Sequence, residues 1–148
     1  MATGRDFFCS IHPLGTLPRQ KFVVVCSFYD GQFMLSRHRK RETWETQGGH
    51  IEPGETPLMA ARRELFEESG VARAELYAVG DYHGWDAVSE SNGTLFLAVV
   101  RELGALPRSE MREARLFPEI PENLTYPSAT PALFQAARDF AAAHSIKL

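Results

Sequence analysis

The sequence predicts an α/β (α+β) fold in which a mixed β-sheet lies between two helices, an α/β/α sandwich. Apolar and β-branched runs typical of strands recur along the chain, two segments have the spacing and end residues of helices, and Gly- or Pro-containing connections separate them. Of the 148 residues 44% are hydrophobic, enough for one core. We therefore interpret residues 1–148 as a single domain.

The first elements expected are the two strands of a hairpin. Residues 21–28, KFVVVCSF, form a continuous apolar run, which is typical of a strand buried on both faces. Asp30-Gly31 predicts a turn, and residues 32–36 predict the second strand. The glycine- and proline-rich segment 48–54, GGHIEPG, then predicts a loop.

A helix is expected over Pro57–Ser69. Thr56 can cap its first turn, Pro57 suits the first helical position, and Gly70 is typical of a helix end. Three apolar residues recur at intervals of three and four, as on one face of a helix: Leu58, Ala61 and Leu65.

The second half of the chain predicts three more strands and a final helix. Residues 75–82 and 94–101 are expected as strands on either side of a loop over residues 84–93. A short strand is expected over residues 114–117. An alanine-rich segment with apolar residues on one side predicts a helix over residues 130–144.

Composition limits the class of partner and the compartment. A net charge of −3 argues against a stable nucleic-acid partner held by a broad basic face, whereas a nucleotide-sized ligand is compatible with it. Cys9 and Cys26 lack metal-ligand or redox spacing and are expected as reduced thiols. Residues 1–11 contain no apolar signal core, and no run is long enough to span a membrane. We expect a cytoplasmic protein without a membrane anchor.

Three glutamates of the first helix form an acidic face. Glu64, Glu67 and Glu68 occupy positions i, i+3 and i+4, so their side chains project from one side of the helix. Carboxylate oxygens suit a hard cation such as Mg²⁺ or Mn²⁺. Without further context, the same spacing is also compatible with a solvated acidic surface.

The flanking residues make a longer motif of nine specified positions within residues 49–71. They are Gly49, Glu55, Arg63, Glu64, Leu65, Glu67, Glu68, Gly70 and Val71. This spacing resembles the box of the Nudix hydrolase family, G-x5-E-x7-R-E-U-x-E-E-x-G-U with U apolar, and every position matches. The resemblance implies a Nudix-type sandwich, with the sheet between the box helix and the C-terminal helix.

The resemblance also implies roles for the box residues. Glu67 and Glu68 resemble the principal metal ligands, and Glu64 resembles a further ligand or the catalytic base. Arg63 and Glu55 resemble an ion pair that fixes the loop against the helix, which agrees with the bidentate geometry of an arginine fork.

Residues outside the box complete the expected site. Gly48 corresponds to a residue whose backbone carbonyl joins the metal shell in this family. A further carboxylate is expected just before a later strand, where Glu110 is our choice, with Glu113 and Glu90 as alternatives. Arg37, at the end of the hairpin, is the expected contact to the substrate phosphates.

The implied reaction is Mg²⁺-dependent hydrolysis, with Mn²⁺ as an alternative cation, of a nucleoside diphosphate linked to a group X. The short chain and the segment FPEIPENL resemble the MutT-like branch, which hydrolyses nucleoside triphosphates, including oxidised purine nucleotides. Thr46-Gln47 and Thr130 depart from that branch, so ADP-ribose, sugar-nucleotide and dinucleoside-polyphosphate hydrolases stay open. A nucleotide-sensing module without catalysis is the other alternative, and a homodimer is compatible with the family.

Overall fold

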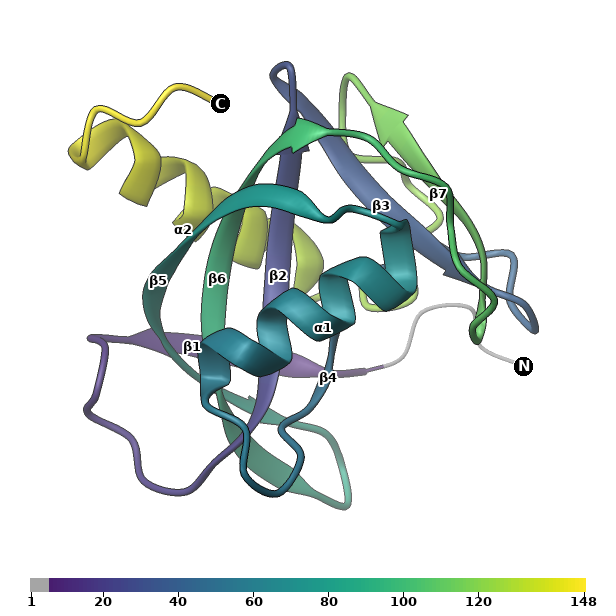
Figure 1. Cartoon of the computed structure of the whole chain (residues 1–148). Coiled ribbons are helices and arrows are strands. Elements are labelled where there is room, and N and C mark those ends of the chain that lie inside the picture. Colours follow the sequence, from purple (N-terminus) through teal and green to yellow (C-terminus); the bar gives the residue numbers. More distant parts are fainter. Residues whose placement is uncertain (1–5) are drawn as a thin grey trace.

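A computed structural model describes residues 6–148. Residues 1–5, which belong to the segment in which no export signal is expected, lie outside the described residues. The elements follow one another in the order β1 (Phe8–His12), β2 (Gln20–Tyr29), β3 (Gln32–His38), β4 (Gln47–His50), α1 (Pro57–Ser69), β5 (Arg73–Trp85), β6 (Glu90–Glu102), β7 (Met111–Phe117) and α2 (Thr130–Ala143) (Figure 1).

All seven strands belong to one mixed sheet. Its order is β1-β5-β6-β2-β3-β7, and β4 pairs separately with β2. The pairing of β2 with β6 is parallel, and the other pairings are antiparallel. Helix α1 lies on one face of the sheet and α2 on the other (Figure 1). The predicted mixed sheet between two helices is confirmed.

Strand β2 is the centre of the sheet and is buried on both faces, as its apolar run predicts. Val23 and Val25 pack on the side of α1, whereas Cys26 and Phe28 pack on the side of α2. The strand also divides its pairing, since residues 22–25 pair with β4 and residues 27–29 pair with β3. This division brings the glycines of β4 directly beside α1.

Helix α1 has the predicted bounds and end residues. The Thr56 hydroxyl accepts a hydrogen bond of 3.1 Å from the Met59 amide, and Gly70 has the left-handed conformation with φ 82°. Ala60, Ala61 and Leu65 are buried against the sheet. The opposite side of the helix is left for charged residues.

The structure differs from the expected elements at three places. Strand β1 was not expected, and it forms because it pairs along its whole length with β5. The expected loop over residues 48–54 begins only at Ile51, because Gln47–His50 pairs with β2. The expected loop over residues 84–93 is shorter, since antiparallel pairing continues to Trp85 and Glu90. In each case backbone pairing with a neighbouring strand outweighs local composition.

Two expectations about environment can be compared with the structure. Over residues 6–148, no helix is both long enough and apolar enough to cross a bilayer. Cys9 and Cys26 are free thiols, and burial raises the pKa of both. Raised thiol pKa values agree with unreactive packing residues rather than nucleophiles.

Candidate metal and diphosphate site

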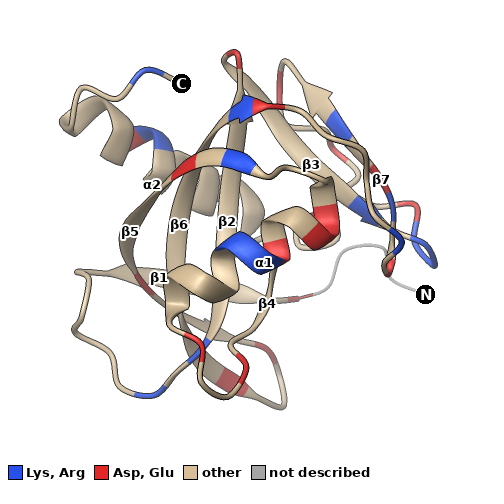
Figure 2. Cartoon of the chain, viewed as in Figure 1, with Lys and Arg blue, Asp and Glu red and all other residues tan. Residues whose placement is uncertain are grey.

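The glutamates of α1 lie against the glycine pair of β4. The Gly48 amide donates a hydrogen bond of 2.9 Å to Oε1 of Glu68. A Cβ atom on Gly49 would overlap the carboxylate of Glu64, so the Glu64 carboxylate lies directly against this glycine. Glu67 is more open, with 48% of its side chain exposed against 12% for Glu64. Figure 2 shows the acidic and basic segments together on α1.

Burial raises the pKa values of two of these carboxyl groups. Burial is the largest cause for Glu68, whose pKa rises to about 9 against the opposing hydrogen bond from Gly48. The negative charges of Glu64, Glu45 and Glu110 raise it further. Burial also raises the pKa of Glu64 to about 7, and the Arg63 charge opposes this rise. The two groups therefore need a proton or a cation to offset their charge.

Arg63 and Glu55 form the ion pair that the resemblance implied. Arg63 donates from Nε to Oε2 of Glu55 at 2.6 Å and from Nη2 to Oε1 at 2.9 Å. Nη2 also donates to the His50 carbonyl at 3.0 Å. Hydrogen bonds from Arg63, and then from the Glu52 amide, lower the pKa of Glu55 to about 2. The loop between β4 and α1 is therefore tied to the helix.

The third nitrogen of Arg63 reaches the acidic face. Nη1 lies 3.4 Å from Oε2 of Glu64 and 3.3 Å from Oε1 of Glu67. Within residues 6–148, no three acidic, histidine or cysteine side chains are gathered into a finished coordination shell. The donor chemistry nevertheless fits Mg²⁺ or Mn²⁺, because the candidate ligands are all carboxylates and two of them are partly buried. Glu64, Glu67 and Glu68 would hold the ion, which competes with Nη1 for the same oxygens.

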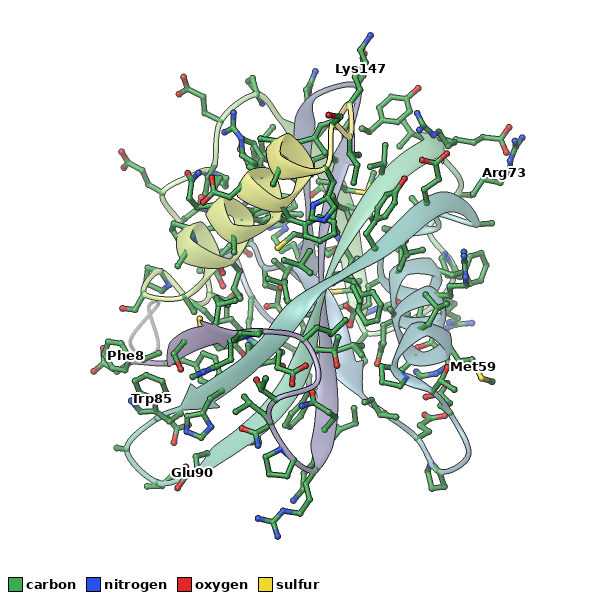
Figure 3. The ribbon with its side chains drawn as sticks, turned by 90° about the vertical axis from the view of Figure 1, so that its left-hand side faces the viewer. Phe8, Met59, Arg73, Trp85, Glu90 and Lys147 are labelled. Carbon is green, nitrogen blue, oxygen red and sulfur yellow. The ribbon has the colours of Figure 1, made fainter. Side chains whose placement is uncertain are left out.

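The further carboxylates occupy different surroundings. Glu110 is 83% exposed beside His38, and its charge acts on Glu68, so it lies on the side of α1. Glu113 instead pairs with Arg37 and Arg115 across the β3–β7 edge. Glu90 pairs with a histidine at the tip of the β5–β6 hairpin, away from α1 (Figure 3). Glu110 is the acid of the three that the structure brings toward Glu68.

Arg37 does not lie among the α1 carboxylates. Its guanidinium pairs with Glu42 at 2.7 Å and with Glu113 at 3.0 Å, and it lies 5.5 Å from the centre of the Trp44 ring. Only 15% of its side chain is exposed, and its buried Nε has no hydrogen-bond partner among the described residues. A phosphate contact for Arg37 stays a prediction. The role of the Gly48 carbonyl also stays one.

Glu45 is an acidic residue near the site that the sequence patterns did not reveal. It is 13% exposed, and its Oε1 accepts hydrogen bonds from Arg41 at 3.0 Å and from Thr125 at 2.9 Å. Its charge contributes to the raised pKa of Glu68. Glu45 lies in the connection before β4, where no helix or strand spacing marks it as a site residue. Its position just before the glycine pair is the local signal that could have identified it.

A buried polar chain supports α1 from beneath. The Ser27 hydroxyl donates to Oε1 of Gln47 at 2.7 Å, and Nε2 of Gln47 donates to the Ser36 hydroxyl at 2.9 Å. Ser36 in turn donates to the Glu68 carbonyl at 2.7 Å. The three side chains are fully buried. They connect β2, β4 and β3 to the end of the acidic helix.

A cavity of about 600 Å³ opens on the other face of the sheet and reaches the β4 glycines. This volume is within the range typical of small-molecule sites. Within the described part of the chain, no Lys or Arg lines it. Its lining includes Phe22, Glu45, Gly48, Gly49, Tyr82, Tyr126 and Leu133. Because Asp6, Glu45 and Asp86 also line it, the cavity is suited to a partly aromatic group without negative charge next to the glutamates.

Comparison with known proteins agrees with this arrangement. RNA pyrophosphohydrolases of Proteus mirabilis and Pectobacterium atrosepticum are each 35% identical over 63 residues, which are 43% of this chain. The match spans only 35% of the length of these relatives. These relatives do not single out the MutT-like branch.

Solved structures share the fold at lower sequence identity. A pyrophosphohydrolase of Bacillus subtilis has a TM-score of 0.74 at 24% identity over 90% of both chains. The NUDIX domain of Shewanella oneidensis NrtR, solved with ADP ribose, has a TM-score of 0.66 at 17% identity, over 83% of this chain and 89% of that one. The NUDIX domain model matches residues 18–132, which is most of the sequence. The chain therefore belongs to the Nudix family.

Proposed function

We propose that this chain is a Mg²⁺-dependent pyrophosphohydrolase that cleaves the diphosphate of a nucleoside diphosphate linked to a group X. One observation carries the proposal. Two partly buried carboxylates, Glu64 and Glu68, face a glycine pair at the rim of a cavity large enough for a nucleoside. A cation at these carboxylates offsets their charge and that of a diphosphate together.

The two sides of the glycine pair suit different parts of such a substrate. The cavity beside α2 has aromatic and hydroxyl groups without a Lys or Arg among the described residues, so we place the nucleoside there. The diphosphate then passes Gly48 and Gly49, which lie against the carboxylates of Glu68 and Glu64. This orientation puts the scissile bond beside α1.

Each box residue has a task in hydrolysis. A bound Mg²⁺ supplies charge neutralisation and a more acidic water. Glu67 and Glu68 would hold the ion, and Glu64 would be a further ligand or would accept a proton from the attacking water as general base. Arg63 donates two hydrogen bonds to Glu55 and so holds the loop before α1 in a fixed position relative to the helix. No side chain needs to form a covalent intermediate.

The substrate class has two candidates. Hydrolysis of nucleoside triphosphates, as in the MutT-like branch, agrees with a cavity of nucleoside size. Hydrolysis at the 5′ end of RNA is favoured by the names of the matching relatives, although the match covers about a third of their length. Both candidates share a terminal polyphosphate. ADP-ribose and sugar nucleotides lack one.

The first experiment measures phosphate and pyrophosphate release with and without Mg²⁺ from nucleoside triphosphates, 8-oxo-dGTP, 5′-triphosphate RNA, ADP-ribose and dinucleoside polyphosphates. Glu67→Gln and Glu68→Gln should each lower turnover roughly a hundredfold or more, because the ion supplies several kcal/mol to the reaction. Glu119→Gln, an exposed position, is the matched control and should behave as the parent. Nucleotide binding without turnover of any substrate would instead identify a sensor.

A further inference from the structure

Three arginines surround a second cavity, at the start of β7. The cavity has a volume of about 650 Å³ and lies between the end of β3 and the connection from β6 to β7. Figure 2 shows Lys and Arg interspersed with Asp and Glu in this region of a chain whose net charge is −3. Its lining residues are Arg39, Leu106, Pro107, Arg108, Met111 and Arg112.

The guanidinium groups of this cavity are largely without protein partners. Arg39 uses Nε to donate to the Ser109 carbonyl at 2.9 Å, which fixes the side chain and leaves both terminal nitrogens without a partner among the described residues. The side chains of Arg108 and Arg112 make no hydrogen bond or ion pair with any residue of 6–148. Three neighbouring cations repel one another, and an anion between them would remove that repulsion.

Several contacts connect the walls of this cavity with the C-terminal end of α1. Ser36 of β3 contacts the Glu68 carbonyl, and Arg39 follows three residues later, roughly 10 Å along an extended chain. The Arg39 amide also donates to the Glu110 carbonyl at 2.9 Å. On the other flank, the backbone of Gly104 packs on Gly70 at the end of α1. The arginine cavity is therefore built into the same unit as the acidic helix.

The carboxylates lie between the two cavities in this chain of contacts. The Glu68 carboxylate accepts a hydrogen bond from the Gly48 amide at the rim of the nucleoside cavity. The Glu68 backbone carbonyl accepts one from Ser36 of β3, the strand that Arg39 follows. We propose that Arg39, Arg108 and Arg112 form an anion subsite for the terminal phosphates of the substrate. This inference rests on the proposed function, and it makes X a phosphate or pyrophosphate group rather than a sugar.

The kinetic test compares substrates that differ in X. In the Arg108→Gln/Arg112→Gln double variant, kcat/KM for GTP should fall roughly tenfold or more, because charge-assisted hydrogen bonds are lost. The value for ADP-ribose should change less than about twofold by the same reasoning. Arg138→Gln, on α2, removes the same charge from the other face of the sheet and is the control. An equal loss of kcat/KM for GTP and ADP-ribose in the double variant would overturn the subsite. The same loss of kcat/KM for GTP in Arg138→Gln would overturn it as well.

A binding measurement separates this inference from the proposed function. Inorganic tripolyphosphate is titrated calorimetrically into the parent and the double variant in EDTA. The parent should bind, and the double variant should bind at least about fivefold more weakly. A parent that does not bind overturns the subsite even if hydrolysis is observed. Arginine-dependent binding without any hydrolysis overturns the proposed function and leaves the subsite standing.

A third comparison identifies which phosphates enter the cavity. GTP is compared with a dinucleotide that carries a 5′-triphosphate and one phosphodiester. An equal loss of kcat/KM for both supports terminal phosphates in the subsite. A loss confined to the dinucleotide overturns the proposal, because the arginines would then bind the backbone phosphate of RNA.

Discussion

The fold buries the Glu68 carboxyl group without a cationic partner from residues 6–148. Its pKa of about 9 lies above the ordinary value of 4.5, mainly because of burial. The protonated form is therefore favoured in the folded chain. The stability contributed by this group is fully present below pH 4.5 and is lost as the pH rises toward 9.

Mg²⁺ should reverse this loss. In EDTA, we expect the Tm of the parent to fall between pH 5 and pH 8, and the Tm of Glu68→Gln to fall less, since the amide has no charge to bury. Mg²⁺ should raise the Tm of the parent more at pH 8 than at pH 5, because the ion binds the ionised carboxylate. Thermal denaturation followed by circular dichroism measures both effects. Equal Mg²⁺ shifts at the two pH values would contradict this account.

The Arg63–Glu55 pair has the opposite pH dependence. Hydrogen bonds lower the pKa of Glu55 to about 2, so its stabilisation is present above pH 4.5 and is lost as the pH falls through 2. Glu55→Gln should lower kcat because the loop before α1 loses its fixed contact. The difference in Tm between Glu55→Gln and the parent should narrow as the pH falls from 4.5 to 3.

Glu75→Gln is the matched control for this prediction. Glu75 is also ion-paired, with Arg101 at 2.8 Å, but the pair lies on β5 and β6 rather than at the loop. It should change stability without changing kcat. A similar kcat in Glu55→Gln and the parent would show that the ion pair does not position the site.

At the scale of elements, the buried chain of Ser27, Gln47 and Ser36 connects three strands with the acidic helix. Gln47→Leu should lower the free energy of unfolding by about 1–3 kcal/mol, because two serine hydroxyls lose a buried partner. It should also lower kcat, since Ser36 holds the Glu68 backbone. Urea denaturation and steady-state kinetics measure the two effects. The control is Gln135→Leu, which removes an exposed amide of α2 and should leave both quantities nearly unchanged.

Elements with a strong local pattern could be predicted from the sequence. Helix α1 has an N-cap, a proline at its first position and a terminal glycine, so its bounds were correct. Strands β1 and β4 could not be predicted. The first has exposed residues on a mixed polar background, and two of the four residues of the second are glycine, so both depend on the strands they pair with.

The same distinction applies to the candidate site. The carboxylates of α1 share one helix, where spacing alone places them on one face. Glu45, Arg108 and Arg112 come from connections or strand ends, and their proximity to the helix depends on the path of the whole chain. No local pattern encodes that path.

At the scale of the whole molecule, a cavity without basic residues, among those described, is distinct from a second cavity lined by arginines. Thr46→Trp should fill the first cavity and raise KM for GTP roughly tenfold, as expected when a pocket is obstructed. Tripolyphosphate binding should be unchanged, because the second cavity is intact. Ala142→Trp adds the same bulk on the exposed side of α2 and should change neither quantity. Reduced tripolyphosphate binding in Thr46→Trp would show that the cavities are not independent.

The contact between Gly70 and Gly104 has a consequence for how related sequences can diverge. A Cβ atom on either residue would collide with the backbone of the opposite segment. Gly70 belongs to the box, whereas Gly104 lies 34 residues later in the connection that carries Arg108. Mutational drift at Gly104 is therefore constrained by the end of the acidic helix. Lineages that lose this glycine should have to rebuild the connection, and with it the arginine cavity, as a unit.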